Sequence, residues 1–433
     1  MWINTLISGL QNFFEPIYKK SYILQNIDHL IGLNIFLVIF ASTIAQSDTI
    51  GYFALFAIIL TAVKFLTKRG EVIEIKGADI CLLIYFILVI ISVSGSTLLH
   101  LSLKGFFKTL TYIGFYISVT NYLKNNKDKI KWIFVSFAAC ACYETVFAFL
   151  QNYGAVEEIS GWQDMTHLNP EEVMTRVYGT LQPYNPNLFG GYMLSIIPAF
   201  IVLPFINKKL LPVSIITGIL SCIGMVLTGC RGAYIGFFFM AIVLICIVYK
   251  LLKPKLQKIF TTIIGFSVLA LSLIIVSTSA LRARIFSIFA MRSDSSNSFR
   301  FNVYQSCIQM LKDNWLLGIG CGNQNFREIY GLYMRTGFDA LSAYNIYLET
   351  AVESGIFALI SFVSFLGINI YKAVKFILSA KTIDAIFVLA ALLSLVGTLT
   401  HGMVDTVFFR PQIQFTFWIM VSIIRTGVNR KAE

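Results

Sequence analysis

The chain has 433 residues, of which 57% are hydrophobic and only 13% charged, and its formal net charge is +12. Soluble domains carry about 25% charged residues, so the composition excludes an ordinary soluble protein and favours an integral membrane protein. The positive charge does not indicate a nucleic-acid partner, because lysines beside membrane spans face anionic lipid headgroups. No soluble basic patch interleaved with aromatic residues is evident in the sequence.

The first 29 residues show no charged segment followed by an apolar core and a cleavage site, so no signal peptide is predicted. Trp2, Phe13, Phe14 and Tyr18 instead predict an amphipathic helix on the cytoplasmic face of the membrane. We expect residues 1–29 to form this cytoplasmic N-terminus.

About twelve apolar stretches follow, each near the length of roughly 20 residues that a membrane-spanning helix needs. They predict an all-α polytopic protein of the bacterial inner membrane with both termini in the cytoplasm, and no internal repeat is evident. The predicted spans are 30–46, 50–67, 78–95, 106–123, 132–151, 187–206, 210–229, 232–251, 259–280, 348–371, 383–403 and 412–426. The expected regions are spans 1–9 at 30–280, a large periplasmic loop at 281–347, spans 10–12 at 348–426 and a tail at 427–433.

The basic residues divide between the two sides of these spans. Most lysines lie in or beside short loops on one side, which the positive-inside rule makes cytoplasmic. Nine of the 12 arginines fall on the other side, where topology does not require positive charge. They are Arg176, Arg231, Arg282, Arg284, Arg292, Arg300, Arg327, Arg335 and Arg410. Because a guanidinium binds phosphate or carboxylate with two parallel donors, the sequence predicts an anion site at the outer face.

Two outer segments are longer than ordinary connections, and long loops are often functional. The first, 152–186, is acidic and contains His167, which is expected at the surface; the second, 281–347, is the largest polar part of the chain. Within the second, residues 298–312 predict an amphipathic helix with Ser298 as its N-cap. A disulfide between Cys307 and Cys321 is one possibility there, and two separate buried thiols are the other.

Two arginines are the first candidates for binding an anion. Arg231 stands between two apolar runs in LTGCRGAYIG, where a charge is costly and is usually paired or functional, although an arginine reaching the interface is the alternative. Arg300 lies near the start of the predicted loop helix, and helix N-termini attract anions. Arg282, Arg284 and Arg292 are better explained as contacts of lipid headgroups.

Titratable residues near the predicted outer ends are candidates for proton transfer. Glu349 and Glu353 lie four residues apart on one helix face, and Glu349 is the better candidate base. His401 and Asp405 have the same spacing, with Arg410 close behind, and a hydrogen bond between them would make the histidine more basic. Each of these residues has a purely structural alternative.

Glu144 lies inside the fifth predicted span, where a carboxylate is a functional candidate unless it pairs with a tyrosine or lysine.

No metal-binding or nucleotide-binding motif is present in the sequence, and GxSxG is absent too. We therefore expect no metal and no cofactor. An enzyme acting outside the cytoplasm has no ATP, so its energy must come with the donor substrate, and a lipid pyrophosphate meets that need.

The segments TGCRGAYIG, FRFNVYQSCIQMLKDNWLLGIGCGNQNF and YNIYLETAVESGIFAL resemble the O-antigen ligase and polymerase (Wzy/WaaL-type) superfamily of membrane glycosyltransferases. The resemblance implies a GT-C-like helical bundle that transfers glycan from undecaprenyl pyrophosphate to an outer-leaflet acceptor without a metal. It also implies that Arg231 and Arg300 bind the pyrophosphate. The family's histidine base falls at Tyr344 here, which departs from the pattern and leaves Glu349, Tyr344 and His401 as candidate catalytic residues. Asp405, Arg410 and Glu353 are candidate supporting residues.

Over nearly its whole length the chain also looks like the cyanobacterial IctB-like subgroup, named for inorganic-carbon (bicarbonate) transport. RVYGTLQPYNPNLFGGY and HGMVDTVFFRPQIQ carry that likeness. Three functions stay open. They are glycan transfer or polymerisation from a polyprenyl-pyrophosphate donor, bicarbonate transport, and binding of lipid-linked glycan without catalysis.

Overall fold

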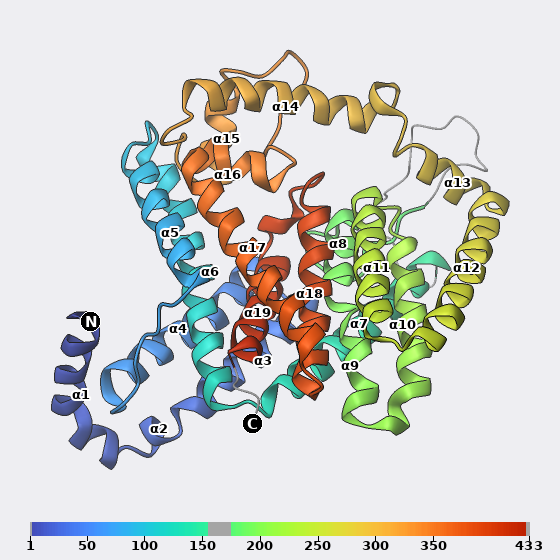
Figure 1. Cartoon of the computed structure of the whole chain (residues 1–433). Coiled ribbons are helices and arrows are strands. Elements are labelled where there is room, and N and C mark those ends of the chain that lie inside the picture. The colour runs from blue at the N-terminus through green and yellow to red at the C-terminus, as the bar shows by residue number, and fades with distance from the viewer. Residues whose placement is uncertain (1, 155–174, 430–433) are drawn as a thin grey trace.

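The computed structural model describes residues 2–154 and 175–429, and nearly all of its ordered elements are helices (Figure 1). The N-terminal part contains α1 (Trp2–Lys20), α2 (Tyr22–Gln25), α3 (Ile27–Ile44), α4 (Ser47–Thr67), α5 (Ala78–Ser94), α6 (Leu99–Asn125) and α7 (Lys129–Asn152). The middle contains α8 (Pro186–Ile196), α9 (Ala199–Ile206), η2 (Lys208–Leu210), α10 (Leu211–Val226), α11 (Arg231–Leu251) and α12 (Pro254–Ser277). The last part contains α13 (Ser279–Phe286), η3 (Met291–Ser293), α14 (Ser295–Asp313), α15 (Asn323–Tyr330), α16 (Ile346–Ser354), α17 (Ile356–Ser379), α18 (Ile383–His401), η4 (Val407–Phe409) and α19 (Pro411–Val428).

The predicted all-α, polytopic architecture is confirmed, since nine helical segments among the described residues are long and apolar enough to cross a membrane. Each predicted span coincides with one or two helices. The helices at 78–95, 106–123 and 412–426, which are α5, α6 and α19, are not among the nine. The helix that we expected within residues 1–29 is present as α1, which packs against α4. The acidic residues of the 152–186 segment and His167 lie outside the described residues.

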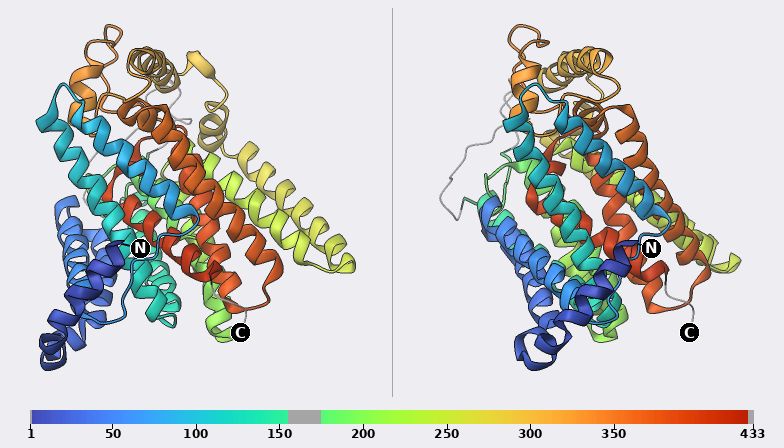
Figure 2. Two further views of the ribbon diagram at one scale, coloured as in Figure 1. Left: turned by 60° about the vertical axis from the view of Figure 1, so that its left-hand side comes forward. Right: turned by 90° about the vertical axis from the view of Figure 1, so that its left-hand side faces the viewer.

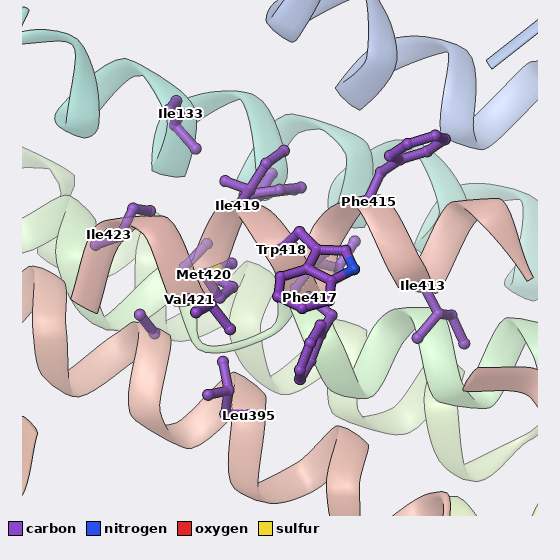
Figure 3. Close-up of a cluster of buried hydrophobic side chains, with 14 of the residues drawn as sticks. Ile133, Leu395, Ile413, Phe415, Phe417, Trp418, Ile419, Met420, Val421 and Ile423 are labelled. Carbon is purple, nitrogen blue, oxygen red and sulfur yellow. The ribbon is translucent and has the colours of Figure 1, made fainter. Parts of the chain in front are cut away.

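The core forms around α19, which packs against α18, α6 and α8. Almost every residue from Ile413 to Ile424 is buried, as expected for a helix that is apolar on all sides. Figure 3 shows the cluster at the middle of this helix, where Phe417 and Trp418 pack with Leu395 of α18 close by. At the other extreme, α12 has no buried residue and lies at the edge of the molecule (Figure 1). Such an apolar, exposed helix is stable only in lipid or against a partner.

Residues 279–345, called the α13–α15 segment below, run across one end of the bundle (Figures 1 and 2). The connection between α9 and α10, with Lys208, and the one between α17 and α18, with Lys381, are at the opposite end of the bundle (Figure 1). α14 begins at Ser295, and its N-cap is Asp294, whose side chain accepts a hydrogen bond from the Asn297 amide at 2.8 Å. The predicted N-cap at Ser298 is therefore wrong, because the acidic side chain one turn earlier caps the helix first.

The predicted tenth span is two helices, with a break at Gly355. Gly355 has φ of +84°, and a Cβ at this position would collide with the carbonyl of Leu316. Just beyond the break, the Ile356 amide donates to the Trp315 carbonyl at 2.9 Å. Only glycine permits this approach of the loop after α14. As a result, Glu349 and Glu353 belong to the short helix α16 and lie outside the membrane-spanning helix α17.

Two further expectations are corrected by the packing. Cys307 and Cys321 are both free and buried, so the alternative of a disulfide between them is wrong. Glu144 is fully buried in α7, and within the described residues its hydrogen bonds go to Thr180, not to a tyrosine or a lysine. Its carboxylate accepts hydrogen bonds from the Thr180 amide at 3.0 Å and the Thr180 hydroxyl at 2.7 Å. It thereby anchors the segment that leads into α8.

Candidate functional site: an arginine-lined cavity

Four arginines from separate parts of the chain line one cavity of about 210 Å³. The cavity lies where the α13–α15 segment meets α8, α11 and the turn after α18. Its cationic lining residues are Arg176, Arg231, Arg284 and Arg300. Asn187, Asn297, Tyr304 and Asp405 are among its other polar lining residues. The predicted pair Arg231 and Arg300 therefore borders one space, although 68 residues separate the two in sequence.

Arg231 is the first residue of α11, and its side chain is only 10% exposed. Its Nη1 lies 2.9 Å from Oδ1 of Asp294 and also donates to the carbonyl of Ser287 at 3.2 Å. Because Asp294 is also the N-cap of α14, one carboxylate fixes both the arginine and the helix above it.

Arg300 lies on the second turn of α14 and reaches towards the turn after α18. Its Nε donates to the carbonyl of Val404 at 2.8 Å, and its Nη2 lies 3.3 Å from Oδ2 of Asp405. The same carboxylate oxygen accepts from Nδ2 of Asn187 at 2.9 Å. Asp405 thus joins α14, the start of α8 and the 402–406 turn at the wall of the cavity.

The sequence did not single out the two remaining arginines, Arg176 and Arg284, as residues of this site. Nε of Arg176 donates to the carbonyl of Thr228, and Nε of Arg284 donates to the carbonyl of Gly229, both at 2.7 Å. Both arginines therefore brace the turn that precedes Arg231. Arg284 is only 8% exposed, so its interpretation as a lipid-headgroup contact is wrong. The small-residue turn TGCRG could have indicated that such arginines are needed. Backbone carbonyls exposed in a turn require hydrogen-bond donors from elsewhere in the chain.

Four guanidinium groups line the cavity. Among the described residues, Asp405 also lines it and pairs with Arg300, while Asp294 pairs with Arg231 from outside the lining. The N-terminal ends of α8 and α11 also border it, through Asn187 and through Cys230 to Gly232, and helix N-termini favour anions. The arrangement can bind an anion that carries more than one negative charge.

His401 lies beneath this cavity and not in its wall. It is 2% exposed, and its Nε2 is 3.5 Å from Sγ of Cys230, which does line the cavity. The ring packs so closely on Gly191 and Gly232 that a Cβ at either glycine would collide with it. The predicted hydrogen bond to Asp405 is replaced by this contact with Cys230, because α18 ends at His401 and the chain turns before Asp405.

Tyr344 is next to Arg300 but does not line the cavity. Its ring centre is 5.6 Å from the guanidinium carbon of Arg300, and it meets Phe299 edge-on. Burial, together with the negative charge of Asp405, raises the pKa of Tyr344 above its usual value. The residue has φ of +51°, an unusual conformation for tyrosine that functional sites sometimes retain.

Glu349 and Glu353 border a different cavity of about 70 Å³. Each accepts a backbone hydrogen bond, Glu349 from the Ala343 amide at 3.1 Å and Glu353 from the Gly322 amide at 2.8 Å. Burial raises the pKa of Glu353 to about 7, and burial with the neighbouring Glu353 raises that of Glu349 well above its usual value. The structure therefore separates both carboxylates from the arginines.

Arg410 is exposed and borders neither cavity. Within the described residues, no group of three or more His, Cys, Asp or Glu side chains is arranged to hold a metal ion.

Comparison with known proteins gives one family. Residues 216–363 match the family model described as O-antigen ligase, and no curated protein matches the chain. The matched part begins in α10 and ends in α17, so it includes three of the four cavity arginines and both carboxylates of the smaller cavity. The chain is thus a multi-pass helical membrane protein in which a segment similar to the O-antigen ligase family borders the arginine-lined cavity.

Proposed function

We propose that this protein transfers or polymerises glycan from a polyprenyl-pyrophosphate donor to an outer-leaflet acceptor, at the periplasmic face of the bacterial inner membrane. The observation that carries the proposal is the convergence of Arg231 and Arg300, with Arg176 and Arg284, on one cavity inside the O-antigen ligase segment and its neighbour α8. Lysines crowd the opposite end of the bundle, which supports a periplasmic position for the cavity.

The chemistry of such a transfer matches what the cavity offers. The acceptor oxygen attacks the anomeric carbon of the donor sugar, the bond to the pyrophosphate oxygen breaks, and negative charge accumulates on the leaving pyrophosphate. Arg231 and Arg300 would stabilise that charge, and their carboxylate and carbonyl partners already hold them in place. No metal is needed for this step when arginines supply the charge.

The structure also favours one base over the others. Tyr344 has a pKa above its usual value near 10, so it is a poor proton acceptor at neutral pH. Glu349 and His401 do not border the arginine cavity. Asp405 does, and we assign it the role of accepting the proton from the acceptor hydroxyl. Asn187 and Arg300 orient its carboxylate.

Apolar residues beside the cavity suit a donor with a lipid carrier. Phe286, Phe289 and Met291 are 62%, 73% and 66% exposed, and Met291 also lines the cavity. Such side chains are stable at a membrane surface, where a polyprenyl chain would lie while its pyrophosphate enters the cavity.

The test compares Arg231→Ala and Arg300→Ala with Arg292→Ala, a matched control because Arg292 is exposed and does not line the cavity. We expect both cavity variants to insert normally and to lose surface glycan, while the control keeps it. Normal glycan in both cavity variants would overturn the proposal. Bicarbonate uptake into liposomes that depends on Arg231 would favour transport instead. Binding of donor without turnover by the unmodified protein would favour a non-catalytic relative.

A further inference from the structure

A cavity larger than the arginine-lined one lies in another part of the described chain, and it shares no lining residue with that site. It has a volume of about 690 Å³, within the range of roughly 300–1,000 Å³ that is typical of ligand sites. It is bounded by α5, α6, the end of α19 and the 72–75 linker. α5 and α6 occupy the opposite flank of the molecule from α11 and α12 (Figure 1).

The cavity exists because α5 and α6 pack mainly on other helices. α5 packs against α17 and α6 against α19, so the two helices make much less contact with each other. The face between them is apolar, and several of its side chains are well exposed, including Leu83 at 42%, Leu110 at 41% and Ile117 at 40%. In a membrane-spanning region, hydrocarbon has to cover these side chains.

One end of this cavity is polar. Lys124, Lys127 and Arg425 line it together with Glu74 and Asp79. Two of the cations are engaged, since Arg425 binds Asp79 at 2.6 Å and Lys124 binds Glu74 at 2.7 Å. Lys127 is exposed and has no ion pair within the described chain. The lining thus consists of apolar side chains along most of the cavity and of charged side chains with a net positive charge at one end.

The length of the cavity fits one membrane leaflet. Leu110 and Lys124 both lie on α6, and a helix rises about 1.5 Å per residue, so they are about 21 Å apart along the axis. One leaflet contributes about 15 Å of hydrocarbon. An acyl chain would therefore reach from the apolar wall to the lysines and leave its headgroup beside them.

We propose that this cavity binds an anionic phospholipid from the surrounding bilayer, with an acyl chain between α5 and α6 and the phosphate at Lys124 and Lys127. Charge complementarity selects an anionic headgroup over a zwitterionic one, since lysines near a membrane surface attract anionic lipids. The site is separate from the arginine cavity and does not depend on the proposed glycan transfer.

The experiment uses full-length protein, purified in mild detergent and depleted of lipid. Native mass spectrometry then follows the binding of phosphatidylglycerol and phosphatidylcholine. We expect the unmodified protein to bind phosphatidylglycerol at least several-fold more tightly than phosphatidylcholine. Lys124→Gln combined with Lys127→Gln should remove most of that preference. Lys255→Gln, an exposed lysine at the same end outside the cavity, should leave it unchanged.

A second variant tests the apolar part of the site. Leu110→Trp fills the space between α5 and α6 and should weaken binding of both phospholipids, while circular dichroism confirms that the helices are retained. Equal binding of the two lipids by the unmodified protein would overturn the proposal. So would phosphatidylglycerol binding that neither the paired lysine variant nor Leu110→Trp changes, or displacement of the phospholipid by a polyprenyl phosphate.

Discussion

Arg231 and Asp294 form an ion pair of 2.9 Å that joins the first residue of α11 to the N-cap of α14. Asp294 is only 3% exposed at its side chain, so this pair is poorly screened by water. It makes the position of the proposed phosphate-binding arginine depend on the helix that carries Arg300. The two arginines are therefore oriented by one connected framework before any donor binds.

The first prediction separates the two roles of Asp294. Asp294→Asn keeps an N-cap side chain for α14 but removes the charge that holds Arg231. We expect glycan transfer to fall about tenfold or more and thermal stability to fall as well, because Arg231 loses the carboxylate with which it pairs. Asp294→Ala removes the cap as well, and losing a cap costs about 1 kcal/mol, so this variant should melt at a still lower temperature. Equal melting temperatures for the two variants would show that Asp294 does not cap α14.

The second prediction concerns Tyr344. Tyr344→Phe keeps the ring beside Arg300 and Phe299 and removes only the hydroxyl. If the hydroxyl is not the base, the variant should retain activity within about twofold of the unmodified protein. Tyr344→Ala removes the ring that packs on Arg300 and should be less active and less stable. A loss of more than a hundredfold in Tyr344→Phe would instead identify the tyrosine hydroxyl as a participant in the reaction.

The sequence was sufficient to predict the helical class and the position of nearly every spanning helix, because these depend on local hydrophobicity, which short windows of sequence record. The expectation that Arg231 and Arg300 share one site came from the family resemblance. The break at Gly355 was missed because the loop carbonyl that requires a glycine there comes from Leu316, nearly 40 residues earlier.

The composition of the site was harder to predict. Arg176 and Arg284 donate hydrogen bonds to the carbonyls of Thr228 and Gly229, respectively. These partners are more than 50 residues apart in the chain, and no sequence pattern connects them. Glu349 was a candidate base because it lies near a predicted outer end of a span, but the break after α16 places it at a separate cavity. Helical spacing relates His401 to Asp405 only where the helix continues, and α18 stops at His401.

The third prediction tests the proposed base. Asp405→Asn retains an oxygen that can accept from Asn187 and Arg300, but the amide cannot take a proton from the acceptor. We expect kcat to fall by roughly 10²- to 10⁴-fold, with a much smaller change in donor affinity. Equilibrium binding of donor and single-turnover transfer separate the two effects. A loss of donor affinity with an unchanged single-turnover rate would mean that Asp405 only positions Arg300.

The final prediction follows from the carboxylates of α16. Burial raises the pKa of Glu353 from 4.5 to about 7, so the folded protein holds a proton that the unfolded chain releases. Stability should then be greatest below about pH 4.5 for this group and should fall as the pH rises through about 7. Glu353→Gln keeps an acceptor for the Gly322 amide and should flatten the melting temperature between these pH values, and adding Glu349→Gln should flatten it further. Glu328→Gln, at an exposed position of α15, is the matched control and should retain the slope of the unmodified protein. An unchanged slope in the double variant would show that these carboxylates do not control the pH dependence.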